Sequence, residues 1–222
     1  MLQAAVALAD AGGIKALSMR KLAQELGVEA MSLYNHVANK DDILDGIVDV
    51  VASEIELPPD GVDWKTALRH TALSAHEVLL RHPWATSLWM RRGISPPRLR
   101  YGDALLRTLR EGGFSKELTY HAFHILESHV VGFTLHRQNF PYDSEQLVEL
   151  AARFLREFPA DEYPDLAEHV MQHTQASYQR QGTFDFGLDL ILDGLERLWA
   201  DAARVAAEAR VREVDVVVAA AV

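Results

Sequence analysis

The sequence predicts an all-α fold, with a three-helix N-terminal domain followed by a larger helical C-terminal domain. Sustained alternation of apolar and polar residues, which is typical of strands, is confined to the last ten residues. Residues that open helices recur instead, each before a run with apolar residues three and four positions apart. They are Ser18, Asn39, Ser95, Ser115 and Ser144. The Leu-Pro-Pro-Asp-Gly segment at 57–61 forbids helix and favours a turn, so we expect the domain boundary there.

The elements follow in order along the chain. Leu2, Val6 and Ala9 give the first helix one apolar face, and Ser18 and Gly27 begin and end the second. Pro83 suits a first helical turn, as does Pro96. The expected helices are 1–11, 18–25, 29–35, 39–55, 63–81, 83–91, 96–111, 116–138, 144–157, 162–180 and 184–207. We therefore expect domains at 1–56 and 57–205, followed by a frayed or disordered Ala- and Val-rich tail at 206–222.

Composition excludes several classes of protein. The 222 residues are 49% hydrophobic and 24% charged, which is typical of a globular chain. The absence of cysteine excludes disulfides, thiolate metal sites and a cysteine nucleophile. No basic leader or run of 18 apolar residues is present, so we expect neither a signal peptide nor a membrane span, and a cytoplasmic protein. The net charge of −10 opposes non-specific binding to nucleic acid or anionic membranes.

A local exception to this acidity lies between Lys15 and Lys40. This window holds four basic residues and only two acidic ones, Glu25 and Glu29. It coincides with a helix, a short turn at Gly27 and a further helix, which is the helix-turn-helix arrangement. The second helix of such a motif enters the major groove of DNA. Any contact with DNA is therefore expected to be a small basic patch on an otherwise acidic molecule.

The residues of this region are more specific than its helical pattern. Met19-Arg20-Lys21-Leu22-Ala23-Gln24-Glu25-Leu26-Gly27-Val28 is followed by Leu33-Tyr34-Asn35-His36-Val37 and by Asn39-Lys40-Asp41-Asp42-Ile43-Leu44. Over about the first 50 residues this resembles the DNA-binding domain of the TetR family of bacterial transcriptional repressors, in particular the branch that contains the tetracycline repressor. The resemblance implies a ligand-responsive repressor that binds a palindromic operator in double-stranded DNA as a homodimer. Its two reading helices would lie about 34 to 36 Å apart.

The resemblance also implies residue roles. Arg20 would donate two hydrogen bonds to a guanine. Tyr34 and Lys40 would contact phosphate, with free N–H groups behind the Asn39 cap as a second anion-binding element. The positions that face the groove are Ala30, Met31, Ser32, Asn35 and His36. In the absence of the motif, each of these would be interpreted as an ordinary surface residue.

Two departures from the family pattern affect DNA binding. Family members usually carry a basic stretch before the first helix, whereas this chain begins at Met1-Leu2-Gln3. Either the true start lies upstream or the protein makes fewer phosphate contacts and has a shallower salt dependence. Asn35 replaces an aromatic residue of the tetracycline repressor, which suggests a different operator.

Dimerisation requires an apolar surface, and the expected helices 116–138 and 184–207 each carry an apolar stripe. In the family the corresponding helices pair across the two-fold axis as a four-helix bundle. The residues predicted for this interface are Phe123, Leu126, Val130, Leu188, Ile191, Leu192, Leu195 and Trp199. The alternative is that both stripes only close the subunit's own core.

An effector pocket is expected where amphipathic side chains gather between residues 70 and 101. The candidates are His76, Trp84, Trp89 and Tyr101. Apolar surroundings with a few polar groups suit a largely apolar or aromatic small molecule. Its binding would reposition the 39–55 helix and separate the two reading helices. Each candidate is also compatible with an ordinary place in the core.

Enzymatic chemistry finds little support. The pairs His121/His124 and His169/His173 share helix faces, but neither forms a recognised metal motif, so no metal and no cofactor are expected. No nucleophile–base pair or phosphate loop occurs. The alternative to a repressor is a helical small-molecule carrier or enzyme whose helix-turn-helix is vestigial, favoured by the acidic charge and the histidine-rich helices. Such a carrier would bind no duplex DNA.

Overall fold

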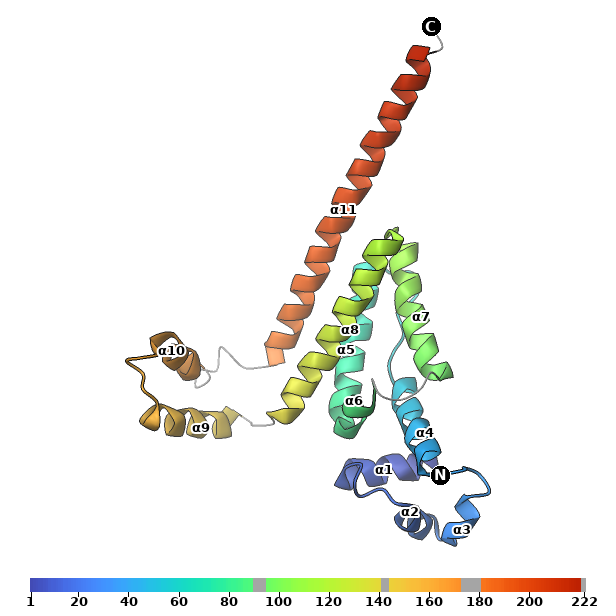
Figure 1. Cartoon of the computed structure of the whole chain (residues 1–222), viewed down its shortest axis with the longest axis vertical. Coiled ribbons are helices and arrows are strands. Elements are labelled where there is room, and N and C mark those ends of the chain that lie inside the picture. Colours follow the sequence, from blue (N-terminus) through green and yellow to red (C-terminus); the bar gives the residue numbers. More distant parts are fainter. Residues whose placement is uncertain (90–94, 141–143, 173–180, 221–222) are drawn as a thin grey trace.

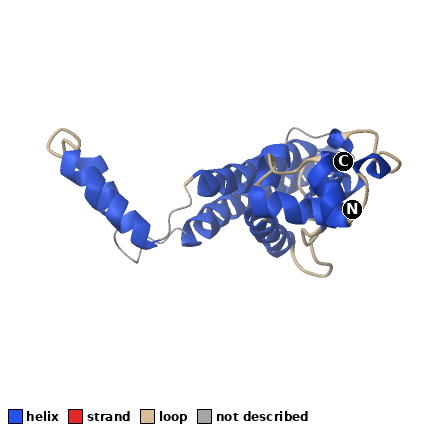
Figure 2. Cartoon of the chain, turned by 90° about the horizontal axis from the view of Figure 1, so that it is seen from below, coloured by secondary structure: helices blue, strands red, loops and turns tan. Residues whose placement is uncertain are grey.

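The computed structural model describes residues 1–89, 95–140, 144–172 and 181–220, and every regular element in these ranges is a helix (Figure 2). Side chains are described for the same residues except 144, 181 and 206–220. Four helices form an N-terminal unit, here called the head: α1 (Leu2–Gly12), α2 (Met19–Leu26), α3 (Ala30–Leu33) and α4 (Lys40–Ser53). The remaining helices are α5 (Trp64–Arg81), α6 (Pro83–Trp89), α7 (Pro96–Glu111), α8 (Lys116–Asn139), α9 (Ser144–Glu157), α10 (Pro164–Gln172) and α11 (Gln181–Ala220).

Local side-chain capping explains where four of these helices begin. The side chains of Ser18, Asn39 and Ser115 each accept a hydrogen bond from the backbone N–H three residues on. Ser95 precedes α7 as predicted, but its side chain makes no capping bond; its hydroxyl donates to the Asp49 carboxylate and accepts from Arg98 instead. The sequence analysis missed Asp63, whose carboxylate accepts from two backbone N–H groups at the start of α5.

The head is built around α4. Its apolar face packs against α1, and its buried side chains include Ile43, Ile47 and Val51. Gly27 ends α2 with a φ of +67°, a left-handed conformation that side chains disfavour, and so turns the chain into α3. On the side away from α1, α4 contacts α6 and α7. The head therefore shares one continuous apolar core with α5, α6, α7, α8 and α11.

The larger part of the molecule, here called the body, is a bundle of α5, α6, α7, α8 and α11 (Figure 1). Ion pairs join α5 to α11: Lys65 lies 2.7 Å from Asp193 and 2.6 Å from Glu196, and Arg69 lies 2.8 Å from Asp189. The α9–α10 pair projects sideways from this bundle, and α11 extends beyond it (Figure 1). No helix in the described ranges is both long and apolar enough to cross a membrane.

The observed boundaries differ from the expected ones in α3 and in α11. α3 ends at Leu33 rather than residue 35, because the next three N–H groups bond to the carbonyl three residues back and form a tighter turn. α11 runs to Ala220, whereas the sequence predicts a frayed or disordered tail from residue 206; alanine, glutamate and arginine in this stretch favour helix. The ends of the predicted helices 83–91 and 162–180 lie outside the described residues. The domain division at residue 57 stays a prediction.

Candidate functional site

The outer surface of the head presents most of the side chains predicted to contact DNA. Met31 is 75% exposed and Tyr34 44% exposed. Arg20, Asn35, His36 and Lys40 are exposed as well, whereas Ala30 and Ser32 are half-buried. Between them, Leu33 is buried in the core and fixes α3 on the head. The predicted set therefore lies around a short helix held in place by one apolar side chain.

Three hydrogen-bonding members of this set are available for a ligand. Within the described residues, the side chains of Arg20, Tyr34 and Lys40 have no hydrogen bond or ion pair. Ser32 differs, because its hydroxyl donates to the Glu29 carbonyl at 2.7 Å and presents only lone pairs outward. Asn35 and His36 follow α3 in the tight turn.

The start of α4 is less favourable to phosphate than expected. Asn39 accepts a hydrogen bond from the Asp42 N–H at 3.1 Å, and the Asp42 carboxylate accepts from the Ala38 N–H at 2.7 Å. Asp41 adds a second carboxylate to the first turn. These negative charges offset the positive end of the helix dipole. Lys40 is therefore the main phosphate-attracting group at this end.

Three of the four predicted effector residues converge on one face of α8. His76 Nδ1 lies 2.7 Å from Thr134 Oγ1. Tyr101 donates a hydrogen bond to Glu127 at 2.6 Å, and Trp89 meets Tyr101 edge to face at 5.8 Å between ring centroids. Glu127 and Thr134 are seven residues apart, or about two helical turns, and so lie on the same side of α8.

His76 is held as a neutral imidazole. The Thr134 hydroxyl donates to the Val130 carbonyl at 2.6 Å, so the hydrogen bond to His76 must come from the Nδ1 proton of the ring. The ring stacks on Phe184 with centroids 3.8 Å apart. Burial, and then the charge on His129, lower the pKa of His76 to about 4. At neutral pH the ring therefore presents Nε2 as a hydrogen-bond acceptor.

Glu127 is the buried acid of this region, although the sequence analysis did not assign it to the pocket. Burial raises the pKa of its carboxyl group, and the hydrogen bonds from Tyr101 and Trp89 oppose that rise. Burial likewise raises the pKa of the Tyr101 hydroxyl. The Tyr101 hydroxyl, the Trp89 indole N–H and the Glu127 carboxyl group together form a small polar site in apolar surroundings.

The fourth predicted effector residue, Trp84, lies elsewhere. Its indole N–H donates to the Asp10 carboxylate of α1 at 2.6 Å, so it sits where α6 meets the head. Apolar periodicity could not reveal a partner 74 positions away in the chain. We therefore remove Trp84 from the effector candidates.

The residues predicted for the dimer interface pack inside their own subunit. Leu126, Val130, Leu188, Leu192 and Leu195 are at most 3% exposed, and Phe123, Ile191 and Trp199 are partly buried against the same core. Trp199, for example, packs against Trp64 and Phe114. These side chains therefore contribute to the subunit's own core, and their place in a dimer interface stays a prediction.

Large apolar side chains also remain exposed on α8 and α11. On α11, Phe186 is 66%, Leu190 55% and Leu198 56% exposed, at spacings of four and eight residues that place them on one face. On α8, Ile125 and Leu135 are 46% and 41% exposed. We call these five residues the outer stripe. Large apolar side chains in such a row are typical of an interface.

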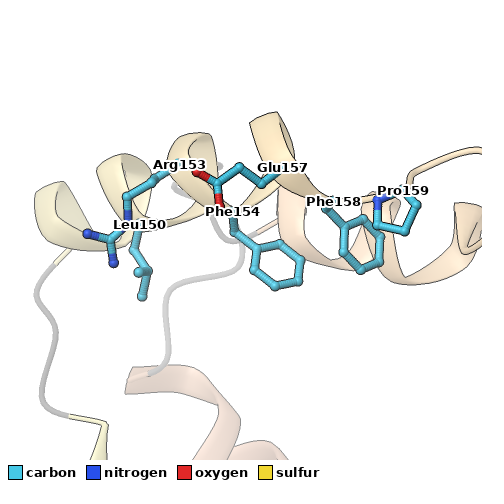
Figure 3. A pocket seen from close by; sticks show the side chains of 6 residues that line it. All are labelled: Leu150, Arg153, Phe154, Glu157, Phe158 and Pro159. Carbon is cyan, nitrogen blue, oxygen red and sulfur yellow. The ribbon is translucent and has the colours of Figure 1, made fainter.

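Two hollows lie away from the predicted effector residues. One of about 300 Å³ follows α9, where the rings of Phe154 and Phe158 lie on the same side of the helix (Figure 3). Another of about 330 Å³ lies between Trp64 and Arg107, beside the prolines that follow the head. Within the described residues no group of three or more His, Asp or Glu side chains is placed to hold a metal ion. His173, predicted to pair with His169, lies outside these residues.

Comparison with known proteins matches both parts of the chain. The model of "Bacterial regulatory proteins, tetR family" matches residues 1–47, and that of "Tetracyclin repressor-like, C-terminal domain" matches 57–199. The transcriptional repressor DrrR1 of Streptomyces coeruleorubidus is 32% identical over 90% of this chain and 77% of its own length. Tetracycline repressor class D of Escherichia coli is 30% identical over 88% and 87%. The ActR structure from Streptomyces coelicolor, in complex with actinorhodin, matches with a TM-score of 0.73 and 29% identity over 88% of this chain and 94% of ActR.

Proposed function

The chain belongs to the TetR family and is a ligand-responsive repressor that binds operator DNA as a homodimer, and we propose which of its surfaces perform each part of that function. The observation that carries the proposal is the group of exposed Arg20, Tyr34 and Lys40 side chains without partners in the described chain. We further propose that the protein regulates transcription and catalyses no reaction, and that it acts in the cytoplasm, where operator DNA is found.

DNA recognition is assigned to the head. Arg20 reads a base edge, Tyr34 and Lys40 hold phosphates, and Met31, Asn35 and His36 face the groove floor. Ala30 and Ser32 contribute shape more than hydrogen bonds, because both are half-buried and the Ser32 proton is already donated. The acidic body repels DNA elsewhere and confines contact to the head.

The test is selection of bound duplexes from a random DNA pool by the purified protein. We expect a palindrome, with Arg20→Ala losing preference at one base pair per half-site at a cost of about 1–3 kcal/mol. Lys40→Ala should weaken all sequences alike and reduce the salt slope by about one. Lys116→Ala, which removes the same charge from an exposed position at the start of α8, is the matched control. Failure to enrich any duplex at low salt would contradict the assignment.

Effector binding is assigned to the face of α8 between Glu127 and Thr134. Aromatic rings of Trp89, Tyr101 and Phe184 favour a largely apolar or aromatic molecule. His76 Nε2 has no partner in the described chain and would accept a hydrogen bond from the effector. The structure of ActR in complex with actinorhodin supports a small-molecule effector for the present chain as well.

The effector assignment is tested by screening compounds, with tetracycline and actinorhodin first, for release of the selected operator duplex. His76→Gln should raise the concentration needed for release about tenfold, since one hydrogen bond to a buried site is lost. His121→Gln, which replaces an exposed histidine on α8, is the control. A compound that releases the duplex at the same concentration from the wild type, from His76→Gln and from Tyr101→Phe would contradict this assignment.

Dimer formation is assigned to the outer stripe. Its apolar side chains lie on α8 and α11, so pairing with a second copy would bring four helices together around a two-fold axis. Five of the side chains predicted for this role offer a partner almost no surface, because they are at most 3% exposed in the subunit: Leu126, Val130, Leu188, Leu192 and Leu195. Pairing through the outer stripe would leave the subunit's own core unchanged.

A further inference from the structure

A cluster of polar and aromatic side chains joins the head to the body, away from the groups assigned to DNA and effector. It comprises Asp10, Glu54, Arg81, His82 and Trp84, and we call it the junction cluster. Asp10 lies in α1 and Glu54 caps the end of α4, whereas the other three belong to the α5–α6 segment of the body. Every hydrogen bond in this cluster except that of Arg81 involves an atom of Asp10 or His82.

His82 lies at the centre of the cluster and is only 8% exposed. Its Nδ1 is 2.8 Å from Asp10 Oδ1, and its Nε2 is 3.2 Å from Glu54 Oε2. Ionised carboxylates only accept hydrogen bonds, and a neutral imidazole has only one N–H to donate. A neutral ring would therefore turn a nitrogen lone pair toward one of the two oxygens. Only the imidazolium form donates to both.

The two carboxylates are also held by other groups of the body. Asp10 Oδ1 accepts from the Trp84 indole at 2.6 Å, and Glu54 Oε2 accepts from Arg81 at 2.9 Å. The Arg81 side chain is 57% exposed, so its pair with Glu54 is screened by water. The His82 side chain is 10% exposed, and its contacts are correspondingly less screened. His82 is thus the one member that contacts both α1 and the end of α4.

We propose that His82 is a positioning residue that fixes the orientation of the head on the body by bridging Asp10 and Glu54, so that operator affinity falls when the ring cannot donate to both carboxylates. The DNA readout of this inference rests on the proposed function. The charged groups that face the ring are Asp10 from α1, Glu54 from the end of α4 and, through Glu54, Arg81 from α5. Loss of the ring proton removes one of the two donors and loosens one of the two helix ends.

The consequence for DNA binding follows from population shift. An operator requires both heads of the dimer at one spacing, and a loosened head spends part of its time at others. Neutralising His82 therefore lowers operator affinity without altering any group that touches DNA. By linkage, weaker holding of the operator-binding orientation also lowers the effector concentration needed for release.

The experiment measures binding of the wild-type-selected operator duplex by fluorescence anisotropy from pH 6 to 8.5. We expect His82→Gln to bind about tenfold more weakly at pH 6, equivalent to about 1.4 kcal/mol, and to have a flatter pH profile than the wild type. His36 is unchanged in both proteins, so the difference between their profiles reports His82. His70→Gln is the matched control, because His70 contacts Glu56 through a single ring nitrogen at 2.7 Å with 43% of its side chain exposed. It should retain the wild-type profile.

Two further measurements separate this inference from the proposed function and from misfolding. In the protein without DNA, hydrogen exchange of α1 amides should accelerate in His82→Gln at constant pH, while that of α8 stays unchanged. Asp10→Asn removes one charge at nearly constant volume, and its double variant with His82→Gln should be less impaired than the sum of the single effects. Wild-type affinity, pH profile and α1 exchange in His82→Gln, or simple additivity of the two substitutions, would overturn the proposal.

Discussion

Replacing Leu190 with glutamate should separate the dimer without unfolding the subunit. Leu190 is 55% exposed on α11, whereas Leu192, two positions along, is fully buried. Complete burial of a leucine contributes about 1.5–3 kcal/mol, so covering the exposed half of Leu190 contributes about 1 kcal/mol per copy. Two-fold symmetry doubles this, and a buried carboxylate costs several kcal/mol more. We expect dimer affinity to fall by at least a thousandfold, or about 4 kcal/mol.

Leu192→Ala is the comparison that distinguishes the two faces of α11. It should lower the free energy of unfolding by about 2.7–5 kcal/mol and leave the intact interface side chains in place. Sedimentation equilibrium gives the dimer dissociation constant, and thermal unfolding of the same samples gives stability. A Leu190→Glu protein that remains dimeric at micromolar concentration, with Leu192→Ala dissociating as a folded monomer, would refute the assignment and restore the interface predicted from sequence.

Three further results are expected. The pKa of about 4 at His76 lies below that of the unfolded ring, so the unfolded state binds more protons between about pH 6.5 and 4. The free energy of unfolding should therefore fall by about 2 kcal/mol on acidification through this window, after allowance for solvent screening. His76→Gln should flatten this dependence of stability on pH. The raised pKa of Glu127 acts in the opposite direction, so its contribution to stability is present at low pH and is lost as pH rises above the unfolded carboxyl pKa. Glu127→Gln should remove that loss. Equal slopes of unfolding free energy against pH in the wild type and the variant would contradict this. A Cβ at Gly187 would lie 2.6 Å from the His129 ring, so Gly187→Ala should displace His129 and lower the melting temperature, whereas Gly132→Ala, with open space at its Cβ, should not.

Sequence alone predicts features that depend on neighbouring residues. Ser18, Asn39 and Ser115 cap their helices as expected, because a cap needs only a side-chain oxygen and a backbone N–H three residues away. Ser95 occupies the same place before α7, yet its hydroxyl bonds to Asp49 of α4. Nothing within α7 reveals that partner. The family motif succeeded for a related reason, since most of its residues lie within one short segment.

Sequence alone predicts less well which face of a helix is buried in the subunit and which residues far apart in the chain are in contact. α11 carries apolar residues on two sides, one through Leu188 and Leu192 and the other through Phe186 and Leu190. Both have helical spacing, so periodicity finds the stripes but does not tell which one meets α8 of the same chain. Of the residues around His76, sequence analysis could name Trp89 and Tyr101, because large amphipathic side chains stand out in a sequence. Thr134 was assigned no pocket role, since its part depends on a side chain 58 positions earlier.

The arrangement suggests how occupation of the pocket reaches the head. Tyr101 contacts Glu127 on α8, and Arg98, three residues earlier on the same face of α7, lies 3.3 Å from Asp49 of α4. An effector that tilts or slides α7 while separating Tyr101 from Glu127 would also displace Arg98, because a helix moves as a rigid element. That movement would strain the contact of Arg98 with α4. The junction cluster holds the same C-terminal half of α4 through Glu54, five residues after Asp49. Release by this route therefore requires the effector to bind the displaced arrangement more tightly by at least the free energy of both attachments.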